Sequence, residues 1–324
     1  MNKLSKDSTL RDALRQPVGE DDAGQRIDNY LMRRLKGVPK SHVYRILRSG
    51  EVRVNSGRIG PDYRLQAGDL LRIPPVRTAE PAAVRPIPKA AFNPVILFED
   101  EALLVINKPS GLAVHGGSGL SFGVIEALRQ MRPDSKFLEL VHRIDRDTSG
   151  VLMLAKKRTA LVELHRQLQA GEVEKRYRAL VKGLWTERKR VVDLPLEKQV
   201  RSSGERRVNV GADGDQSITI FRLERRVGPY SLLDADLKTG RTHQIRVHLA
   251  HLGFPILGDD KYGDFVLNKT LPKLGLKRMF LHSWRVVIRH PLSRERVTIE
   301  APLPEELRAF IEITGKTKKH APAV

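Results

Sequence analysis

Apolar residues recur at helical spacing in two short segments near the beginning of the chain, and a glycine follows each segment. This spacing predicts two amphipathic helices that end at Gly37 and Gly50, because glycine is common just after the last helical turn. Shorter alternating stretches follow, separated by turn residues. The pattern therefore predicts a module of two helices and a small sheet over residues 24–75. Its apolar positions are Ile27, Tyr30, Leu31, Leu35, Val43, Ile46, Leu47, Val52, Val54, Leu70, Leu71 and Ile73.

A longer pattern begins at Val95 and continues to residue 314. Strands outnumber helices in it and do not alternate with them regularly, which predicts an α+β domain with a mixed, largely antiparallel sheet flanked by helices and loops. We expect strands near residues 95–99, 102–107, 151–156, 175–183, 217–225, 230–238, 284–290 and 296–300. We expect helices near residues 124–131, 161–168, 243–252 and 307–311.

Three segments carry no apolar period. Residues 1–23 are polar with scattered charge and are predicted to form a flexible tail. Residues 76–94 are rich in proline and alanine, which favours a semi-rigid linker. Residues 315–324 are predicted to be a loose basic tail. The chain therefore divides into a small module and a larger domain joined by a tether.

The charge of the chain narrows the class of partner. Its 324 residues contain 58 Lys and Arg against 38 Asp and Glu, a formal net charge of +20. Such a field attracts polyanions, above all nucleic acid, although a solvated basic surface is the simpler alternative. An anionic membrane would also be attracted. However, no apolar run approaches the ~20 residues of a spanning helix, and the first residues lack the apolar core of a signal peptide. We expect a cytoplasmic protein that does not bind a membrane.

The chain has no cysteine. This excludes disulfides, thiolate catalysis and zinc sites built on cysteine, and it is consistent with a reducing compartment. His243, His248 and His251 lack the His-Glu-x-x-His spacing of a zinc site, so RNA contact or helix capping is favoured over metal binding. The glycine-rich segment 115–123 lacks the arrangement of a phosphate-binding loop. No metal or nucleotide cofactor is predicted.

Basic residues are concentrated in the small module, where 11 Lys and Arg stand against 4 Asp and Glu between Gly24 and Pro75, a net charge of 11 − 4 = +7. The sequence GQRIDNYLMRRLKGVPKSHVYRILRSGEVRVNSGRI resembles the S4 RNA-binding domain. The resemblance implies that the helix pair presents a basic surface to folded RNA; an ordinary solvated helix face is the alternative. The residues expected to contact RNA are Arg26, Arg33, Lys40, Arg45 and Arg48.

A candidate for chemistry lies in the segment VHRIDRDTSGVLMLAKKR, which is polar up to Gly150 and then apolar. Asp145 is therefore predicted to lie in a loop at the beginning of a strand. Arg143 and Arg146 flank it and favour its ionised form, and an ionised carboxylate can act as a nucleophile. The alternative is a simple turn, because Asp147, Thr148 and Ser149 are good turn and capping residues. The residues alone leave both readings open.

The same loop, HRIDRDTSG, resembles the signature of the large-subunit and tRNA pseudouridine synthase family. Three further segments resemble the family in the same order: INKPSGLAVHGG at 106–117, EKRYRALVKG at 174–183 and TGRTHQIRVHLAHLGFPILGDDKYG at 239–263. The resemblance spans both domains, and the S4 module points to members that modify the large ribosomal subunit. It implies an isomerase that needs no cofactor, with Asp145 as its catalytic carboxylate.

The resemblance also assigns roles to other residues. Tyr177 matches a tyrosine that stacks on the flipped base, although packing on a strand face would explain it equally. Arg246 matches an arginine that pairs with the aspartate, and an inward-facing arginine on a helix needs such a partner. Leu281 matches an apolar residue of the base pocket, although an ordinary core leucine would show the same pattern. The remaining residues expected at the base pocket or on RNA are His142, Arg143, Arg241 and His243.

The implied reaction converts uridines of 23S ribosomal RNA, or of its precursor, into pseudouridine after the base is flipped out of the stack. Asp145 would attack the sugar carbon or remove a proton from the sugar, and Tyr177 is a candidate for proton transfer. The chain is expected to act as a monomer without a protein partner. Two other functions are weighed against this one: an RNA-binding protein without catalysis, and a glycosidic hydrolase that uses Asp145 and Asp147 as a carboxylate pair.

Overall fold

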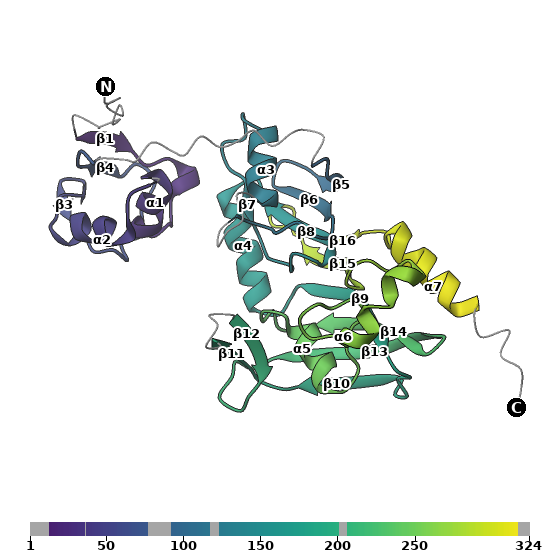
Figure 1. The fold of residues 1–324 in the computed structure, drawn as a ribbon. Helices are drawn as coiled ribbons and strands as arrows, with labels where there is room; N and C mark the ends of the chain where they lie inside the picture. The colour runs from purple at the N-terminus through teal and green to yellow at the C-terminus, as the bar shows by residue number, and fades with distance from the viewer. Residues whose placement is uncertain (1–12, 36, 77–91, 117–122, 201–205, 317–324) are drawn as a thin grey trace, which may run out of the picture. The chain divides into compact units, whose positions relative to one another are not determined.

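The computed structural model describes residues 13–35, 37–76, 92–116, 123–200 and 206–316 (Figure 1). The chain forms two compact units, Met1–Ile87 and Pro88–Val324. The boundary between them falls within the segment predicted to be a linker, of which residues 77–91 lie outside the described residues. Each unit is described by itself.

The first unit contains the two predicted helices and a small antiparallel sheet. The apolar faces of α1 and α2 meet the sheet in one core, which includes Ile27, Ile46 and Leu71. The strands lie in the order β1-β4-β2-β3. The elements are β1 (Leu14–Pro17), α1 (Ile27–Arg34), α2 (Lys40–Arg48), β2 (Arg53–Val54), β3 (Gly57–Arg58) and β4 (Leu70–Ile73), with a short 3₁₀ turn, η1 (Glu20–Asp22), after β1. The predicted helices and sheet are thus confirmed.

The predicted flexible tail is wrong in its second half. β1 pairs with β4 along its whole length, from Leu14 opposite Ile73 to Pro17 opposite Leu70. Val18, which follows β1, is only 3% exposed in the core of this unit. The strand is too short for its alternation to be visible in the sequence, and its partner lies more than fifty positions away. Residues 1–12 lie outside the described residues.

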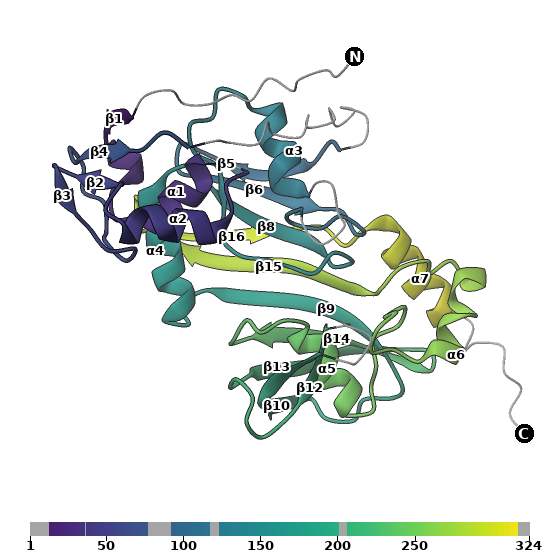
Figure 2. The ribbon, with the colours of Figure 1, turned by 60° about the vertical axis from the view of Figure 1, so that its left-hand side comes forward.

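The second unit is built on one long curved sheet (Figures 1 and 2). Its strands lie in the order β10-β13-β14-β9-β15-β8-β6-β5, with β16 beside β15 and β7 beside β8. Only β15 and β8 pair in parallel, at His282 opposite Ser149 and Ser283 opposite Gly150, and the other pairs are antiparallel. The prediction of a mixed, largely antiparallel sheet is therefore confirmed.

The strands of this sheet are β5 (Val95–Glu99), β6 (Leu103–Lys108), β7 (Glu139–Leu140), β8 (Ser149–Ala155), β9 (Glu174–Lys182), β10 (Lys189–Asp193), β13 (Ile218–Val227), β14 (Tyr230–Leu237), β15 (Leu281–Arg289) and β16 (Arg296–Glu300). A separate hairpin consists of β11 (Leu196–Val200) and β12 (Arg206–Val210). The helical elements are α3 (Val124–Met131), α4 (Arg158–Gln169), α5 (Gln244–His251), α6 (Phe265–Asn268), the 3₁₀ turn η3 (Leu271–Leu274) and α7 (Glu305–Lys316). The short elements β7, β10, β11, β12 and α6 were not predicted.

The predicted limits of the linker and of the C-terminal tail need correction. Val76 and Phe92, at the described ends of the linker, are 3% and 4% exposed, so each belongs to a packed unit. The last helix, α7, continues to Lys316, two residues into the predicted tail. Leu307, Phe310, Ile311 and Thr314 bury its inner face, which extends the helical pattern beyond its last apolar residue. Residues 317–324 lie outside the described residues.

Candidate active site

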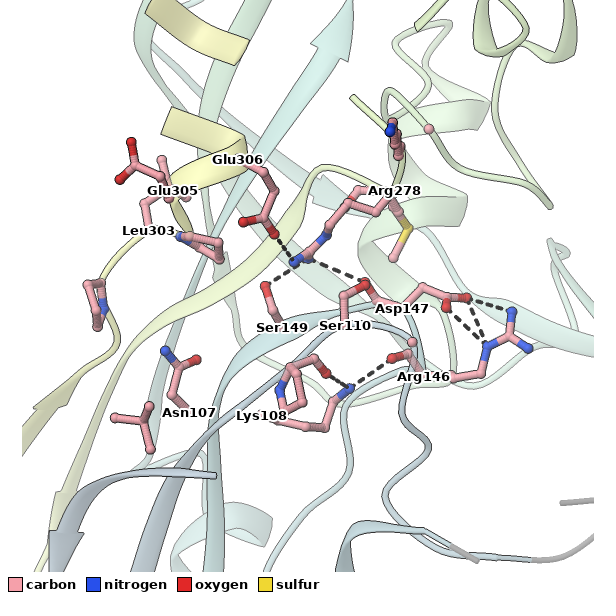
Figure 3. A pocket seen from close by; sticks show the side chains of 18 of the residues that line it. Asn107, Lys108, Ser110, Arg146, Asp147, Ser149, Arg278, Leu303, Glu305 and Glu306 are labelled. Carbon is pink, nitrogen blue, oxygen red and sulfur yellow. Dashed lines mark hydrogen bonds and ion pairs between the residues drawn. The ribbon is translucent and has the colours of Figure 1, made fainter. Parts of the chain in front are cut away.

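Asp145 lies in the loop between β7 and β8, as predicted. A buried side chain of the domain binds the backbone of this loop. Lys108, at the end of β6, is fully buried and donates hydrogen bonds of 2.8 Å to the carbonyl oxygens of Pro109, Leu112 and Arg146. Burial lowers the pKa of Lys108 to about 7, whereas three carbonyl acceptors favour the ammonium form, since a neutral amine has only two hydrogens to donate. Figure 3 shows Lys108 beneath the loop.

The end of the loop is fixed where β8 begins. Arg278 donates to the Ser149 hydroxyl at 2.7 Å and lies 3.3 Å from the Glu306 carboxylate on α7, as Figure 3 shows. Gly150 has a φ of +110°, and a Cβ added there would lie 2.1 Å from the carbonyl oxygen of Ser283 on β15. Only glycine allows the two parallel strands to approach this closely. The loop is therefore a rigid support for Asp145.

A buried arginine on α5 binds Asp145. The Arg246 guanidinium donates from one terminal nitrogen to Asp145 Oδ2 at 3.1 Å. Its opposite edge forms a two-pronged contact with Asp259, at 2.7 Å to Oδ2 and 2.8 Å to Oδ1. The side chain of Arg246 is 5% exposed, that of Asp259 is 1% exposed and that of Asp145 is 24% exposed. Arg246 thus links a buried carboxylate to one that is open to a ligand.

Asp259 and Asp145 stabilise the charged form of Arg246. Burial acts to lower the pKa of Arg246, but the hydrogen bonds and charge of Asp259, together with the charge of Asp145, raise it above its ordinary value. For Asp259, burial acts to raise the pKa, and the contact with Arg246 holds it below its usual range. Both groups are therefore ionised at neutral pH. The ring of Tyr262 covers the guanidinium of Arg246, with its centroid 5.1 Å away.

His243 lies beside the same carboxylate. It precedes α5 in the left-handed conformation, with a φ of +57°. Its Nδ1 lies 2.9 Å from the Tyr262 hydroxyl, and its Nε2 lies 4.0 Å from Asp145 Oδ1. Burial lowers the pKa of His243, against the opposing charge of Asp145. The left-handed backbone of His243 is strained, and the contacts of this residue with α5 and Tyr262 stabilise it.

Tyr177 lies on β9, next to β14 and β15, opposite Ala235 and Ser283. It is 5% exposed and lines a pocket together with Asp145, Arg246 and Leu281. Burial raises the pKa of the Tyr177 phenol to about 12, with a smaller contribution from the charge of Asp145. The hydroxyl is therefore protonated at neutral pH. Tyr177 is both a buried strand residue and a pocket residue, so the two interpretations of its position are compatible.

The site has an inner and an outer part. A wide groove of about 1210 Å³ runs past the loop that carries Asp145 and is lined by residues of β9, the end of β14 and the segment before α5. A narrow pocket of about 70 Å³ lies at Asp145, Tyr177 and Leu281 and shares several lining residues with the groove. The inner pocket combines the apolar faces of Tyr177 and Leu281 with the polar groups of Asp145 and Arg246.

A second cavity, of about 970 Å³, lies on the other side of the loop (Figure 3). It is lined by Arg146 and Asp147 but not by Asp145, Tyr177 or Arg246. Arg146 and Asp147 pair with each other at 3.0 Å. The Arg146 guanidinium therefore turns to Asp147, and the arginine that contacts the Asp145 carboxylate is Arg246.

The other predicted pocket residues lie along the groove with different roles. Arg143 is exposed there and suits contact with RNA. Arg241 also lines the groove, where it lies 3.5 Å from the Asp215 carboxylate. His142 accepts a hydrogen bond from the Met153 amide at 3.2 Å, and burial lowers its pKa to about 4, so it is a neutral support of the loop. His248 is bound by Thr219 and the Leu194 carbonyl and supports α5 rather than capping it.

In the small unit, four of the five predicted RNA-contact residues lie exposed on α1 and α2, and Arg26 is half-buried just before α1. Three of them have acidic partners: Arg26 pairs with Asp28, Arg33 with Asp22 and Arg45 with Glu51. Among the described residues, Lys40 and Arg48 have no carboxylate partner. Of the five predicted residues, these two have the least compensated charge.

Sequence reasoning missed Asp259, Tyr262 and Lys108. All three lie within segments that carry the family resemblance. None of them belongs to an apolar period that would predict which way its side chain points. A signal existed for Asp259, because a buried guanidinium has more donors than one carboxylate can satisfy.

The cofactor and membrane predictions meet the following observations. Within the described ranges, no group of three or more His, Asp or Glu residues is arranged to hold a metal ion. No helix in the described part of the chain is long and apolar enough to cross a membrane. In the glycine-rich segment, residues 117–122 lie outside the described residues.

Comparison with known proteins gives the following matches. A family model described as RNA pseudouridylate synthase matches residues 102–251, and one described as S4 domain matches residues 25–71. The chain is 53% identical to ribosomal large subunit pseudouridine synthase C of Pasteurella multocida over 96% of its length and 97% of that protein. It is 54% identical to the protein of the same name from Escherichia coli, over 91% of this chain and 94% of that one.

Solved structures agree with these matches. Human RNA pseudouridylate synthase domain containing 4 superposes with a TM-score of 0.56 and 26% identity, covering 68% of this chain and 92% of the human one. Human RNA pseudouridylate synthase domain containing 1 gives a TM-score of 0.55, also at 26% identity, and covers 72% and 90%.

Proposed function

This chain belongs to the RNA pseudouridylate synthase family, and we propose that it isomerises selected uridines of large-subunit (23S) ribosomal RNA with Asp145 as the catalytic carboxylate. The observation that carries the proposal is the contact of Asp145 with a buried, permanently charged guanidinium at the mouth of a narrow pocket. The substrate is inferred from the names of the relatives and from the S4 unit.

The reaction requires the target base to leave the RNA stack, because the bond between uracil N1 and the sugar is inaccessible in a stacked strand. Flipping costs a few kcal/mol, and the pocket at Tyr177 and Leu281 offsets this cost by stacking and apolar contact. Asp145 lies at the mouth of this pocket, where the sugar of the flipped nucleotide would be. We propose that Arg143, which is exposed on the same loop, occupies part of the space that the base leaves; its exposure beside the groove supports this role.

Asp145 then serves the sugar in one of two ways. It attacks C1′, or it removes the proton at C2′, and either event breaks the bond from C1′ to N1. Uracil turns in the pocket and C5 bonds to C1′. As this bond forms, the bond from Asp145 to C1′ breaks in the first route, and Asp145 returns the proton to C2′ in the second. The proton on C5 is then lost while N1 gains one, so that the product is an isomer of the substrate. No water, nucleotide or electron is consumed. The hydrogen bond from Arg246 holds the Asp145 carboxylate in its orientation.

The role of Tyr177 is narrower than the sequence suggested. A phenol with a pKa near 12 does not readily give up its proton at neutral pH, so Tyr177 is a poor general base in the free protein. Stacking on the uracil and donating a hydrogen bond fit its position better.

The two other functions have less support. A hydrolase needs two facing carboxylates, whereas the Asp147 carboxylate, which lines the groove as well as the second cavity, is paired with Arg146. A binding protein without catalysis gives no reason for the buried charge network at Asp145. We propose further that the chain acts in the cytoplasm as a monomer without a protein partner or cofactor.

The test is to incubate the purified protein with unmodified large-subunit rRNA and to map pseudouridine at nucleotide resolution. Wild type is expected to modify a small set of uridines that also lose their modification in a deletion strain, and Asp145→Asn is expected to modify none. Small-subunit rRNA serves as the control substrate. Free uracil with an abasic site would indicate the hydrolase, and complementation of the deletion by Asp145→Ala would indicate a binding protein.

A further inference from the structure

Lys175 is a buried lysine on the wall of the groove with no partner among the described residues. It lies on β9, two positions before Tyr177 and on the same face of the strand. Only 7% of it is exposed, yet it lines the groove. Within the described part of the chain, it has no hydrogen bond or ion pair. An ammonium group has three hydrogens to donate, and here all three are available.

The surroundings do not neutralise this charge. The ammonium lies near the turn at Gly240, where an added Cβ would lie 3.8 Å from Lys175 Nζ. The Asp236 carboxylate, which favours the charged form of Lys175, is already bound by Lys238 at 3.0 Å and lies 3.5 Å from Arg222. Burial accordingly lowers the pKa of Lys175. A buried charge without a partner is unfavourable, so a structure that keeps one open to a groove is expected to receive an anion there.

The position of Lys175 selects the part of the substrate that it meets. Lys175 lines the outer groove but not the inner pocket, where Tyr177, Leu281 and Asp145 lie. Side chains two positions apart on one strand face are separated by about 6–7 Å. A base stacked on Tyr177 therefore leaves its own backbone, and not its carbonyl groups, near Lys175. Among the groups of RNA, the phosphate is the one that carries a full negative charge.

We propose that Lys175 binds a backbone phosphate adjacent to the flipped uridine. This inference rests on the proposed function. Lys175 is a substrate-binding residue in this account and not a participant in bond cleavage. Because the ammonium is desolvated before RNA arrives, a phosphate that reaches it forms a strong charge-assisted hydrogen bond.

The test uses Lys175→Met, which keeps most of the unbranched side chain and removes its charge. Lys182→Met is the matched control, because Lys182 lies on the same strand, is 51% exposed, pairs with Asp264 and does not line the groove. The substrate is a short RNA that contains a uridine mapped with the wild-type protein. Two further RNAs carry one uncharged methylphosphonate each, on the 5′ or the 3′ side of that uridine.

For Lys175→Met, we expect binding to weaken about tenfold or more, which is typical of losing a charge-assisted hydrogen bond. The slope of log affinity against log salt is expected to fall by about one. One methylphosphonate is expected to weaken binding to wild type by a similar factor and to have no further effect on Lys175→Met. The rate constant at saturating enzyme should change much less than the affinity, and Lys182→Met should match wild type in all these respects.

Three results would overturn the proposal: neither methylphosphonate weakens binding to wild type, the two changes act independently, or Lys175→Met lowers the rate constant at saturation while affinity is unchanged. The last result would place the lysine at the base. Lys175→Met is also expected to unfold at the same temperature as wild type or higher in the absence of RNA. The methylphosphonate measurement on wild type decides the matter if this variant does not fold. Absence of pseudouridine with wild type would instead refute the proposed function.

Discussion

At the scale of single residues, the site depends on a guanidinium with two partners. Arg246 is oriented by Asp259 from inside the domain, and this leaves one terminal nitrogen directed at Asp145. The sequence predicted the contact between Arg246 and Asp145 from a resemblance, and the structure brings the two together. It could not predict Asp259, because a carboxylate thirteen positions after Arg246 has no pattern that shows which way it points.

The first prediction concerns this inner carboxylate. Asp259→Asn is expected to lower the free energy of unfolding by about 3–5 kcal/mol, because it leaves a buried guanidinium without its counter-charge. Isomerisation should slow as Arg246 loses its orientation, while RNA binding is retained. Urea unfolding and single-turnover assays measure the two effects. Asp260→Asn is the control, since Asp260 is 70% exposed and its contact with Arg246 is 3.6 Å long. Equal effects of the two substitutions would contradict the account.

The second prediction concerns buried histidines. Burial lowers the pKa of His282 from 6.5 to about 4. The unfolded chain therefore binds more protons than the folded one below pH ~6.5, and stability is lost as the pH falls from there towards 4, by at most on the order of 3 kcal/mol for this residue. The pKa of carboxylates such as Glu99 is lowered to about 2, so these groups affect stability only at pH values below their ordinary pKa of 4.5. Urea unfolding between pH 7 and 5 should thus depend less on pH in His282→Asn; an unchanged dependence would refute this assignment.

At the scale of elements, the loop that carries Asp145 is fixed where β8 and β15 pair in parallel. The strand patterns at 151–156 and 284–290 predicted both strands to within a few residues. Their parallel contact was not predictable, since it joins segments more than 130 positions apart and spans only two residue pairs. Nor could alternation reveal that Gly150 faces the backbone of Ser283, because a glycine carries no side chain to indicate its direction.

The third prediction tests this junction. Gly150→Ala is expected to cost about 2–5 kcal/mol of stability, through strain at positive φ and a clash with the Ser283 carbonyl, and to displace the catalytic loop. Gly111→Ala is the matched control: it also has a positive φ, of +84°, but nothing lies within 4 Å of its added Cβ. It should lose only about 1–2 kcal/mol. Thermal unfolding and the isomerisation rate compare the two, and a Gly150→Ala protein as active as Gly111→Ala would count against a rigid loop.

At the scale of the whole molecule, charge and domain division were the features most readily predicted. The net charge of +20 and the cluster of basic residues between Gly24 and Pro75 indicated nucleic acid before any motif was considered. The two units follow the predicted division, although β1 extends the first unit into the segment predicted to be a tail. That strand belongs to its sheet through a distant partner, which local composition does not report.

The fourth prediction concerns the small unit. Removal of residues 1–75 is expected to weaken binding to large-subunit rRNA and to reduce the dependence of affinity on salt, because several phosphate contacts are lost. The catalytic domain should keep its fold, since its core contains no residue of the first unit. Filter binding across a salt series and circular dichroism measure the two outcomes. An unchanged salt slope would argue against RNA contact by α1 and α2.

The central claim is that Asp145, held by Arg246, performs the chemistry, and single-turnover isomerisation at saturating enzyme tests it most directly. Asp145→Asn and Asp147→Asn remove carboxylates two positions apart on one loop, and only the first of these carboxylates contacts Arg246. The account predicts normal RNA binding by both variants, loss of several orders of magnitude in rate for Asp145→Asn, and a rate near that of wild type for Asp147→Asn. An active Asp145→Asn protein, or equal loss in both variants, would contradict it.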